Sequence, residues 1–489
     1  MFKDKNRLIF YIISLVFIAI NITLITIDVY YFSFLPIILL FVLASFISLD
    51  KVLLSIVFLT PLSIQLIDIL PGLPINMALP TEPLLAGVLL LFVFKLLLNN
   101  QLNRKILLHP VSITIYINLF WILITSLTST MPLVSLKFLL SRLWFVIGAY
   151  FLMIEIFRKQ KNINKFIGLY TVALGIVIIY TNIRLLSYGL NNQSASNWVV
   201  QPFFNDHTSY GAMLVMFVFP LVFFMLKKTD DLFEKTLVYL FFGLFVFGII
   251  LSYTRAAWLS LFASLMLWVV IKLKIKIKTI LIVCLVFVVS FLTLQRVIID
   301  NLEENEAESS GKFSEHIESM INISSDASNV ERINRWKCAI RMFAEKPLFG
   351  WGPGTYTFNY APFQKYQDLS TISTNFGDLG NAHSEYLGAL SESGLLGMLS
   401  FMLVVFMAFR TAYLVYHNTS NKSIKQFTLF IVLGLTTYFI HAFLNNFLDT
   451  DKASIPVWGF MAILVALDIY HKNNNEDTLS YNDKESLKN

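Results

Sequence analysis

The chain has 489 residues, of which 56% are hydrophobic and only 14% are charged. A soluble protein of this length would need far more polar surface, so the composition indicates a polytopic membrane protein. The formal net charge of +6 says little about nucleic acid, because the positive residues gather between the apolar runs, as membrane topology requires. Those runs are continuous and do not alternate, which favours membrane-spanning helices over an outer-membrane barrel.

Hydropathy predicts an all-α bundle of about 12–14 transmembrane helices, since a helical span needs about 20 mostly apolar residues. The first run is too long for the apolar part of a signal peptide, so we expect a retained span. Several other runs are short or closely joined. The segments lie near residues 8–27, 30–48, 52–70, 82–99, 110–129, 133–156, 164–186, 208–227, 235–252, 255–273, 279–296, 390–409, 425–446 and 455–470.

The distribution of Lys and Arg predicts the orientation, because positive residues are enriched in cytoplasmic loops. With the amino terminus inside, every basic cluster falls on the cytoplasmic side. This topology places the 187–207 loop, the corner at 253–256 and the long loop after Arg296 outside. The clusters lie at residues 3–7, 95–105, 158–165, 227–228 and 272–278.

Four regions follow from this topology. They are transmembrane helices at 1–296, a large helical extracytoplasmic loop at 297–389, further transmembrane helices at 390–470 and a polar cytoplasmic tail, expected to be disordered, at 471–489. The two cysteines, Cys284 and Cys338, form neither a disulfide framework nor a metal-binding pattern.

The extracytoplasmic loop carries most of the chemistry-bearing residues. It begins acidic and serine-rich at 301–328, and from about Asn329 the pattern turns helical. Arg332, Trp336, Ala339 or Ile340, and Phe343 recur at spacings of three and four, which predicts that they share one face of a helix. Pro347 is expected to end that helix.

A glycine-rich turn follows. Gly350, Gly352 and Gly354 surround Trp351 and Pro353, and such a sequence predicts a turn that only small residues allow. Turns of this kind can also present backbone N–H groups to a phosphate. A nucleotide-binding fold is not implied, because the glycines do not follow a strand. The segment 381–387 then leads into the next helix, which is expected to begin near His383.

These motifs, in this order, resemble the O-antigen ligase and polymerase superfamily. The pattern is R-x-x-x-W from Arg332, P-x-x-G-x-G-x-G from Pro347, H-S-x-x-L from His383, and E-x-G-x-x-G from Glu392 at the opening of a span. Two upstream segments strengthen the likeness. Ser252-Tyr253-Thr254-Arg255-Ala256-Ala257-Trp258 resembles the family's corner between two spans, and Phe204-Asn205-Asp206-His207-Thr208-Ser209-Tyr210-Gly211 resembles a short motif at the start of an earlier span. The resemblance covers roughly residues 200–410.

The resemblance implies a glycosyltransferase in the bacterial inner membrane that works on the outer face. The donor would be a glycan on undecaprenyl pyrophosphate. The acceptor would be a sugar hydroxyl, on lipid A-core for a ligase or on another lipid-linked glycan for a polymerase; related oligosaccharyltransferases modify protein. Ligase is the leading interpretation. No nucleotide sugar, cofactor, metal or nucleic acid would be expected, and the partners would be the donor, the acceptor and membrane lipid.

Two arginines are the candidates for binding the donor pyrophosphate. Arg255 stands at an outer membrane corner, where an unpaired charge is costly, and a guanidinium fork matches phosphate oxygens. Arg332 would be the second ligand, and two cations would stabilise the charge that develops on the leaving group. Arg335 is a secondary candidate by position. The alternatives are an Arg255 that anchors its helix at the interface and an Arg332 that pairs with a nearby glutamate.

His383 is the candidate general base. Transfer to a hydroxyl needs its proton removed as the new bond forms, and a neutral imidazole suits this task near pH 7. A single displacement at the anomeric carbon would invert its configuration. Glu385 or Glu392 could orient the imidazole. The alternatives are a packing or capping role for His383 and a simple helix-start position for Glu392.

Five further residues are secondary candidates. His207 and Asp206 face outward at the start of a span, where Asp is also a favoured helix cap. Lys137 and Arg142 lie in the outer half of a predicted span and must face protein, water or lipid phosphate. His441 shares a helical stripe with polar residues four and eight positions later, which could line an acceptor cleft or only bond to neighbouring helices.

Two other classes of function are alternatives to the enzyme. A transporter or flippase could use Lys137, Arg142 and Arg255 to line a path. However, the chain lacks paired Gly- or Pro-broken spans in matching halves, and its candidate groups crowd the outer end. A structural scaffold fits least, because it would not need cations beside apolar spans.

Overall fold

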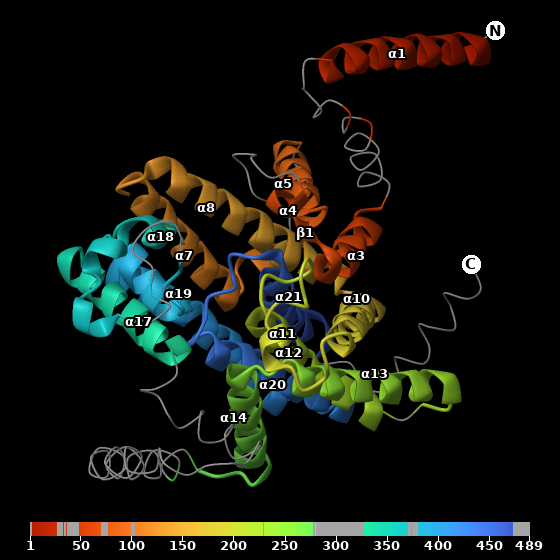
Figure 1. The fold of residues 1–489 in the computed structure, drawn as a ribbon. Helices are drawn as coiled ribbons and strands as arrows, with labels where there is room; N and C mark the ends of the chain where they lie inside the picture. Colours follow the sequence, from red (N-terminus) through yellow and green to blue (C-terminus); the bar gives the residue numbers. More distant parts are fainter. Residues whose placement is uncertain are drawn as a thin grey trace.

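The computed structural model describes residues 2–26, 33, 36, 48–69, 77–98, 103–227, 229–276, 279, 327–369, 373 and 380–472. Within these residues the protein is almost entirely helical, which confirms the predicted all-α class (Figure 1). Most of the predicted spans at 30–48 and 279–296, the acidic stretch at 301–326, Cys284 and most of the tail lie outside the described residues.

Nine described helices are long and apolar enough to cross a membrane, so the protein is a multi-pass membrane protein. Each coincides with a segment predicted from hydropathy. The second contains a π-helical turn at Ile147–Phe151, and the last ends in one at Leu467–His471. The nine are α7 (Pro110–Leu127), α8 with α9 (Pro132–Ile156), α10 (Gln160–Leu186), α12 (His207–Leu226), α13 (Leu232–Leu251), α14 (Arg255–Lys272), α19 (Glu385–Asn418), α20 (Lys422–His441) and α21 (Asp451–His471 with its final turn).

The remaining amino-terminal elements are less regular. The predicted span at 8–27 lies in α1 (Phe2–Ile25), and the one at 82–99 lies in α5 (Thr81–Leu97), a helix of 17 residues. The segment predicted as one span at 52–70 is broken instead. Its parts are α3 (Leu49–Leu59), a 3₁₀ turn (Thr60–Leu62), β1 (Ile64–Gln65) and α4 (Leu66–Ile69), and β1 pairs antiparallel with β2 (Ala78–Leu79).

The break has a local cause. Pro61 lacks an N–H and cannot continue the helical ladder of α3. The chain then bonds across to 78–79, and the side chains of Ser63 and Thr81 both donate to the Asp451 carboxylate at the start of α21. The amine of Lys452 donates to the carbonyl oxygens of Thr60 (2.9 Å) and Ser63 (2.7 Å). Polar groups inside a membrane bundle are satisfied by such mutual bonds.

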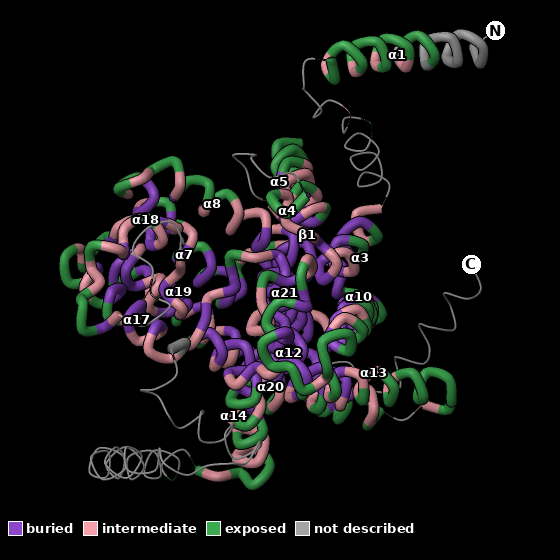
Figure 2. The backbone as a smooth tube through the Cα atoms, viewed as in Figure 1, coloured by how far each residue is buried: buried purple, intermediate pink, exposed green. Residues whose placement is uncertain are grey.

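The helix α21 forms the centre of the bundle. Of its membrane-spanning window, 83% is buried, whereas the same measure is 22% for α13 and for α14. Figure 2 accordingly shows α21 and α12 in the buried colour and the outer parts of α13 and α14 exposed. Since lipid is as apolar as a leucine side chain, exposed apolar helices of this kind are expected at the periphery of a membrane bundle.

Contacts gather the helix ends into two groups. At one end, Asn103 bonds to the Tyr470 hydroxyl (3.0 Å), and the His471 ring bonds to the carbonyl of Phe157 (2.8 Å). These segments are among those predicted to be cytoplasmic. At the opposite end, the N–H of Thr130 donates to the carbonyl of Trp351 (3.0 Å). The grouping agrees with alternating spans, while the side that faces the cytoplasm stays a prediction.

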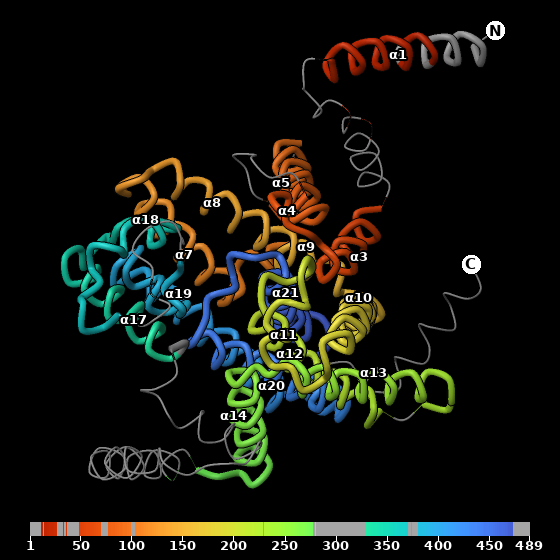
Figure 3. Tube along the Cα trace, viewed as in Figure 1, coloured from red at the N-terminus to blue at the C-terminus, as the bar shows by residue number. Residues whose placement is uncertain are grey.

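Residues 327–369 form a small helical unit on one flank of the bundle. It contains α17 (Ala327–Glu345), α18 (Tyr356–Asn359) and two 3₁₀ turns (Ala361–Phe363 and Tyr366–Asp368). Its own core is small and includes Cys338, Met342 and Tyr356. Figures 1 and 3 show this unit beside α7, α8 and α19, and α17 packs on α19. Short connecting helices (α6, Arg104–Leu107; α11, Gln193–Ser196) complete the described fold.

Candidate functional site

The corner between α13 and α14 fixes Arg255 beside the start of α12. The Thr254 hydroxyl donates to the carbonyl of His207 (2.8 Å). A Cβ on Gly211 would lie 2.7 Å from the Thr254 hydroxyl oxygen, so glycine allows this close approach. Tyr253 adopts φ +49°, a left-handed conformation that residues other than glycine adopt rarely and that concentrates at functional sites. Two motifs far apart in the sequence therefore form one packed unit.

The second arginine comes from α17. Arg332 Nη1 donates to Asn329 Oδ1 (3.2 Å), one turn earlier in the helix. Trp336 follows one turn later, and its indole N–H donates to the backbone carbonyl of His383 (3.1 Å). The spacing of four residues thus puts the arginine and the tryptophan on one face, as predicted, and the tryptophan ties that face to the histidine segment.

These groups line a cavity of about 550 Å³. Arg255 is the first residue of α14 and His207 is the first residue of α12, so two helix amino termini open near it. Each amino terminus carries a partial positive charge, which adds to that of the guanidinium groups. The cavity is therefore suited to an anion. Its lining includes His207, Thr208, Tyr253, Arg255, Arg332 and Trp336.

His383 is not among the residues that line this cavity, but it is bonded to one of them, Trp336. Its backbone N–H donates to Asn381 Oδ1 (3.0 Å) and its carbonyl accepts from Trp336, and these bonds hold it at φ +49°. Burial, followed by the nearby positive charges of Arg332 and Arg335, lowers the pKa of the imidazole to about 4. The ring is therefore neutral near pH 7 and able to accept a proton.

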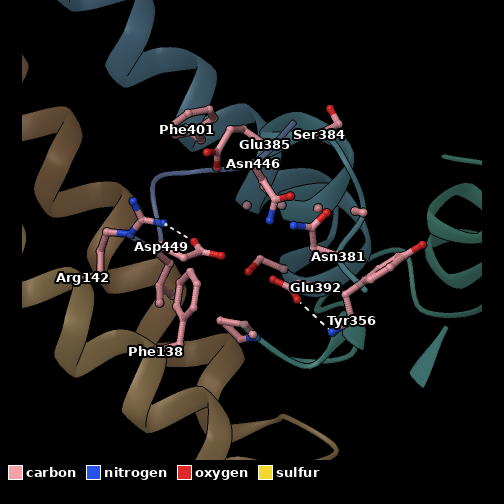
Figure 4. A pocket seen from close by; sticks show the side chains of 18 of the residues that line it. Phe138, Arg142, Tyr356, Asn381, Ser384, Glu385, Glu392, Phe401, Asn446 and Asp449 are labelled. Atoms are coloured by element: carbon pink, nitrogen blue, oxygen red, sulfur yellow. Dashed lines mark hydrogen bonds and ion pairs between the residues drawn. The ribbon is translucent and has the colours of Figure 1, made fainter. Parts of the chain in front are cut away.

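A second, smaller cavity of about 130 Å³ lies on the other side of the histidine segment. Figure 4 shows Arg142 and Phe138 of α8 on one side of it and Tyr356 and Asn381 on the other. The carboxylate of Asp449 pairs with Arg142 at 3.6 Å. The direct neighbours of His383 in the chain, residues 382 and 384, line this cavity, so the histidine segment separates the two cavities.

Arg335, the competitor of Arg332, is engaged elsewhere. Its Nε donates to Glu331 Oε1 at 2.6 Å, and its guanidinium lies 3.8 Å from the centre of the Tyr360 ring. The side chain is buried and does not belong to the lining of either cavity. We conclude that Arg335 joins α17 to the segment around α18, and that Arg332 is the better placed of the two for a ligand.

The two glutamates considered as partners of His383 bond to other groups. Glu385 Oε1 accepts from the Tyr438 hydroxyl (2.9 Å) and from the N–H groups of residues 447 (2.7 Å) and 448 (2.8 Å). Glu392 Oε1 accepts from the N–H of Tyr356 (2.8 Å). The bonds of each carboxylate thus fix loops of the site, and the bonds from Asn381 and Trp336 hold the backbone of His383.

The remaining secondary candidates lie in different places and have different contacts. Asp206 caps α12 by accepting from the N–H groups of residues 208 (2.9 Å) and 209 (2.8 Å), which is the structural alternative noted above. His441 is buried, bonds to Asn445 (3.0 Å) and lies within electrostatic reach of Arg332 and His207. Lys137 is exposed on α8, outside both cavities.

The glycine-rich turn serves packing. The N–H groups of Trp351 and Gly352 donate to carbonyl oxygens of residues 391 (3.1 Å) and 392 (2.8 Å) in α19. At that point α19 is kinked at Gly394, which has φ +69°. A Cβ there would lie 2.1 Å from the carbonyl oxygen of Leu348. These N–H groups are therefore already used, and the idea that the turn presents them to a phosphate is not supported for this pair.

Sequence reasoning missed several residues of the second cavity. Asn446, Thr357 and Trp458 line it, and each has a buried polar atom with no partner among the described residues. Asn446 follows the polar stripe of His441 by one position. The only feature in the sequence that could have pointed to it is that it is a polar residue near the end of a span. Trp458 lies within an apolar span, so nothing in the sequence distinguished its N–H from packing.

Comparison with known families agrees with this geometry. Residues 240–402 match a family model described as O-antigen ligase, and this range contains Arg255, Arg332 and His383. A search among curated proteins found no match to the chain. The match supports membrane glycosyltransferase activity of the ligase or polymerase type. Residues 240–402 of this chain are therefore similar to the O-antigen ligase family.

Proposed function

We propose that this protein transfers a glycan from undecaprenyl pyrophosphate to a hydroxyl of lipid A-core at the outer face of the bacterial inner membrane. The observation that carries the proposal is the pairing of Arg255 and Arg332 in one cavity, whose Trp336 bonds to the backbone of a neutral His383. A cavity that contains two guanidinium groups and lies near two helix amino termini suits a pyrophosphate. The same chemistry serves a polymerase or a protein-modifying transferase, which differ in the acceptor.

The reaction follows from these positions. The acceptor oxygen attacks the anomeric carbon of the donor glycan as His383 removes the hydroxyl proton. The bond from that carbon to the pyrophosphate oxygen breaks, and its electron pair leaves on undecaprenyl pyrophosphate. Arg255 and Arg332 stabilise the negative charge that develops on this leaving group. One displacement of this kind inverts the anomeric configuration.

The test is a surface-glycan gel of the host with the gene deleted, complemented by wild type or by His383→Ala. We expect His383→Ala to lower transfer by ~10²-fold or more, since a positioned general base contributes roughly 10²–10⁴-fold. Loss of all glycan from the lipid anchor, with long polymer accumulating on undecaprenyl pyrophosphate, supports the ligase. A single repeat unit still on the anchor would indicate a polymerase, and a normal pattern with His383→Ala would exclude the general-base role.

A further inference from the structure

The loop that joins α10 to α12 supplies part of the lining of the arginine cavity, the one that Arg255 and Arg332 line. Gln193 and Asn197 of this loop are exposed and also line the cavity, so the cavity reaches the protein surface beside them. The loop lies before residues 240–402, the range that matches the family model. It therefore adds to the cavity a wall that the family match does not cover, and loops on a rigid scaffold commonly carry binding residues.

Amide side chains and aromatic rings dominate this loop. Residues 185–205 contain no charged side chain but six amide side chains, at positions 191–193, 197, 201 and 205. An amide both donates and accepts hydrogen bonds, as a sugar hydroxyl group does. Tyr188 and Trp198 are 51% and 37% exposed. Such a surface offers no charge to a further phosphate, whereas its rings and amides match the faces and edges of an uncharged sugar ring.

The two exposed rings are held in place by their neighbours. The ring centres of Tyr188 and Trp198 lie 5.0 Å apart with their planes at 75°, which is an edge-to-face contact. The guanidinium of Arg184 lies over the Trp198 ring, 5.5 Å from its centre, and donates to the carbonyl of Val199 (3.0 Å). The Trp198 ring is therefore fixed before any ligand arrives, which lowers the entropic cost of stacking on it.

The same loop is fixed to the corner that carries Arg255. The hydroxyl of Tyr253 donates to the carbonyl of Leu190 (3.0 Å), and Tyr253 precedes Arg255 by two residues. A small buried cluster also joins the loop to the last turn of α13; it comprises Leu185, Ala195, Val199 and Leu251. A glycan attached to a pyrophosphate at Arg255 therefore has this loop beside it.

We propose that Tyr188, Gln193, Asn197 and Trp198 form a glycan-binding surface that holds uncharged sugar residues of the donor. The inference rests on the proposed function and adds to it a site that selects the donor glycan. The rings stack on sugar faces, and the amides bond to sugar hydroxyl groups. Exposed Trp and Tyr residues are also common at membrane interfaces. An interfacial role accounts for the rings alone, whereas a bound glycan accounts for the rings and for the amides that continue into the cavity.

Two changes remove the proposed contacts. Trp198→Ala removes the stacking face, and Trp198→Phe keeps an aromatic one. The double change of Gln193→Ala with Asn197→Ala removes two exposed amides, and surface substitutions of this kind rarely affect folding. Tyr366→Ala, at a side chain that is 93% exposed, and Asn191→Ala, at an exposed amide, are the matched controls, because neither residue belongs to the lining of either cavity.

Binding to the full chain in lipid nanodiscs is measured with three probes. They are undecaprenyl pyrophosphate, the same lipid carrying the host glycan, and core oligosaccharide released from the host's lipid anchor. We expect Trp198→Ala and the double variant to weaken binding of the lipid-linked glycan about tenfold and to leave the other two affinities unchanged. Trp198→Phe and both controls should bind as wild type does. In transfer assays, KM for the donor should rise at constant kcat, which indicates a contact made equally in the ground state and the transition state.

Three results would overturn the inference. Unchanged binding of the lipid-linked glycan in Trp198→Ala and in the double variant would show that the surface does not contact the donor glycan. Equal losses for the lipid-linked glycan and for undecaprenyl pyrophosphate would show that the loop acts on the lipid or on the Arg255 corner. A loss confined to the core oligosaccharide would assign the surface to the acceptor.

Failure of the proposed function has a different signature. Arg255→Ala and Arg332→Ala would then leave undecaprenyl pyrophosphate binding unchanged. The host glycan, freed from its pyrophosphate by mild acid, tests the surface independently of that binding step. Trp198→Ala should weaken binding of this free glycan, and Tyr366→Ala should not.

Discussion

At the scale of single residues, the two arginines of the larger cavity differ from a third, Arg335, in what they contact. Arg255 and Arg332 line the cavity, whereas Arg335 is held by Glu331 and the Tyr360 ring. A guanidinium can bind two phosphate oxygens through its planar fork, and an ammonium cannot. The geometry of the charge therefore matters in addition to its sign.

We predict that Arg332→Lys lowers the transfer rate about tenfold and Arg332→Ala by ~10²–10³-fold, as for the loss of one preorganised charge-stabilising donor. Initial rates of transfer in isolated membranes measure both effects. Arg335→Ala should mainly lower thermal stability, since it removes the ion pair that Arg335 forms with the buried Glu331. The assignment is reversed if Arg335→Ala slows transfer at full stability while Arg332→Ala does not.

The protonation of His383 makes a second residue-scale prediction. Its pKa is lowered to about 4, so the imidazole is in its basic form above that pH and becomes protonated only below it. We expect kcat/KM for the donor to stay level as pH falls from 7 and to decline only as it approaches 4. Bound pyrophosphate offsets the charge of Arg332 and raises the pKa, so the acid limb of kcat should lie at higher pH.

The measurement is a pair of pH–rate profiles for the wild type and for the residual activity of His383→Gln. An acid limb that persists unchanged in His383→Gln belongs to another group. The same shift affects folding stability. Because the folded pKa lies below the unfolded value of about 6.5, the unfolded state binds more protons between these values, and stability falls as pH drops from 6.5 towards 4.

At the scale of elements, the kink of α19 connects the glycine-rich turn to the membrane bundle. Gly394 has φ +69° and sits against the backbone of Leu348. We predict that Gly394→Ala destabilises the protein by more than about 1–2 kcal/mol, the approximate cost of a left-handed conformation for an ordinary residue. The clash with Leu348 adds to this cost. Thermal unfolding in nanodiscs, followed by tryptophan fluorescence, measures the change.

Gly243 in α13 provides the control for this substitution. A Cβ there meets nothing within 4 Å, and its φ is not positive. Gly243→Ala should be neutral or stabilising by about 0.5–1 kcal/mol, since alanine has the higher helix propensity. Equal stability of Gly394→Ala and Gly243→Ala would show that the kink is not needed for packing.

At the scale of the whole molecule, the basic clusters predict which end faces the cytoplasm. In a variant without Cys284 and Cys338, we introduce one cysteine, by Leu348→Cys or by Ser420→Cys. Both positions are exposed and lie at opposite ends of α19. A membrane-impermeant maleimide applied to right-side-out vesicles should label position 348 at once and position 420 only after permeabilisation. The reverse pattern would place the arginine cavity inside.

Much of this architecture could be predicted from the sequence. The nine described long helices all coincide with apolar segments, because the bilayer requires such runs and no distant contact changes that requirement. The helix from about 329 to Pro347 was also predictable, because its period and its terminating proline are local signals. The 52–70 segment was predicted wrongly. Pro61 is a local signal of the break, but the bonds that satisfy the broken segment come from residues 78–79 and from α21.

The sequence by itself therefore determined the class of protein, the positions of its long helices and the residue types able to bind a pyrophosphate. Only the tertiary structure decided which of two nearby arginines faces the cavity and what the two glutamates bond to. It also revealed a second cavity beside His383. The physical reason is that hydropathy acts on continuous runs of chain, whereas a cavity is formed by side chains whose positions are fixed by helices far apart in sequence.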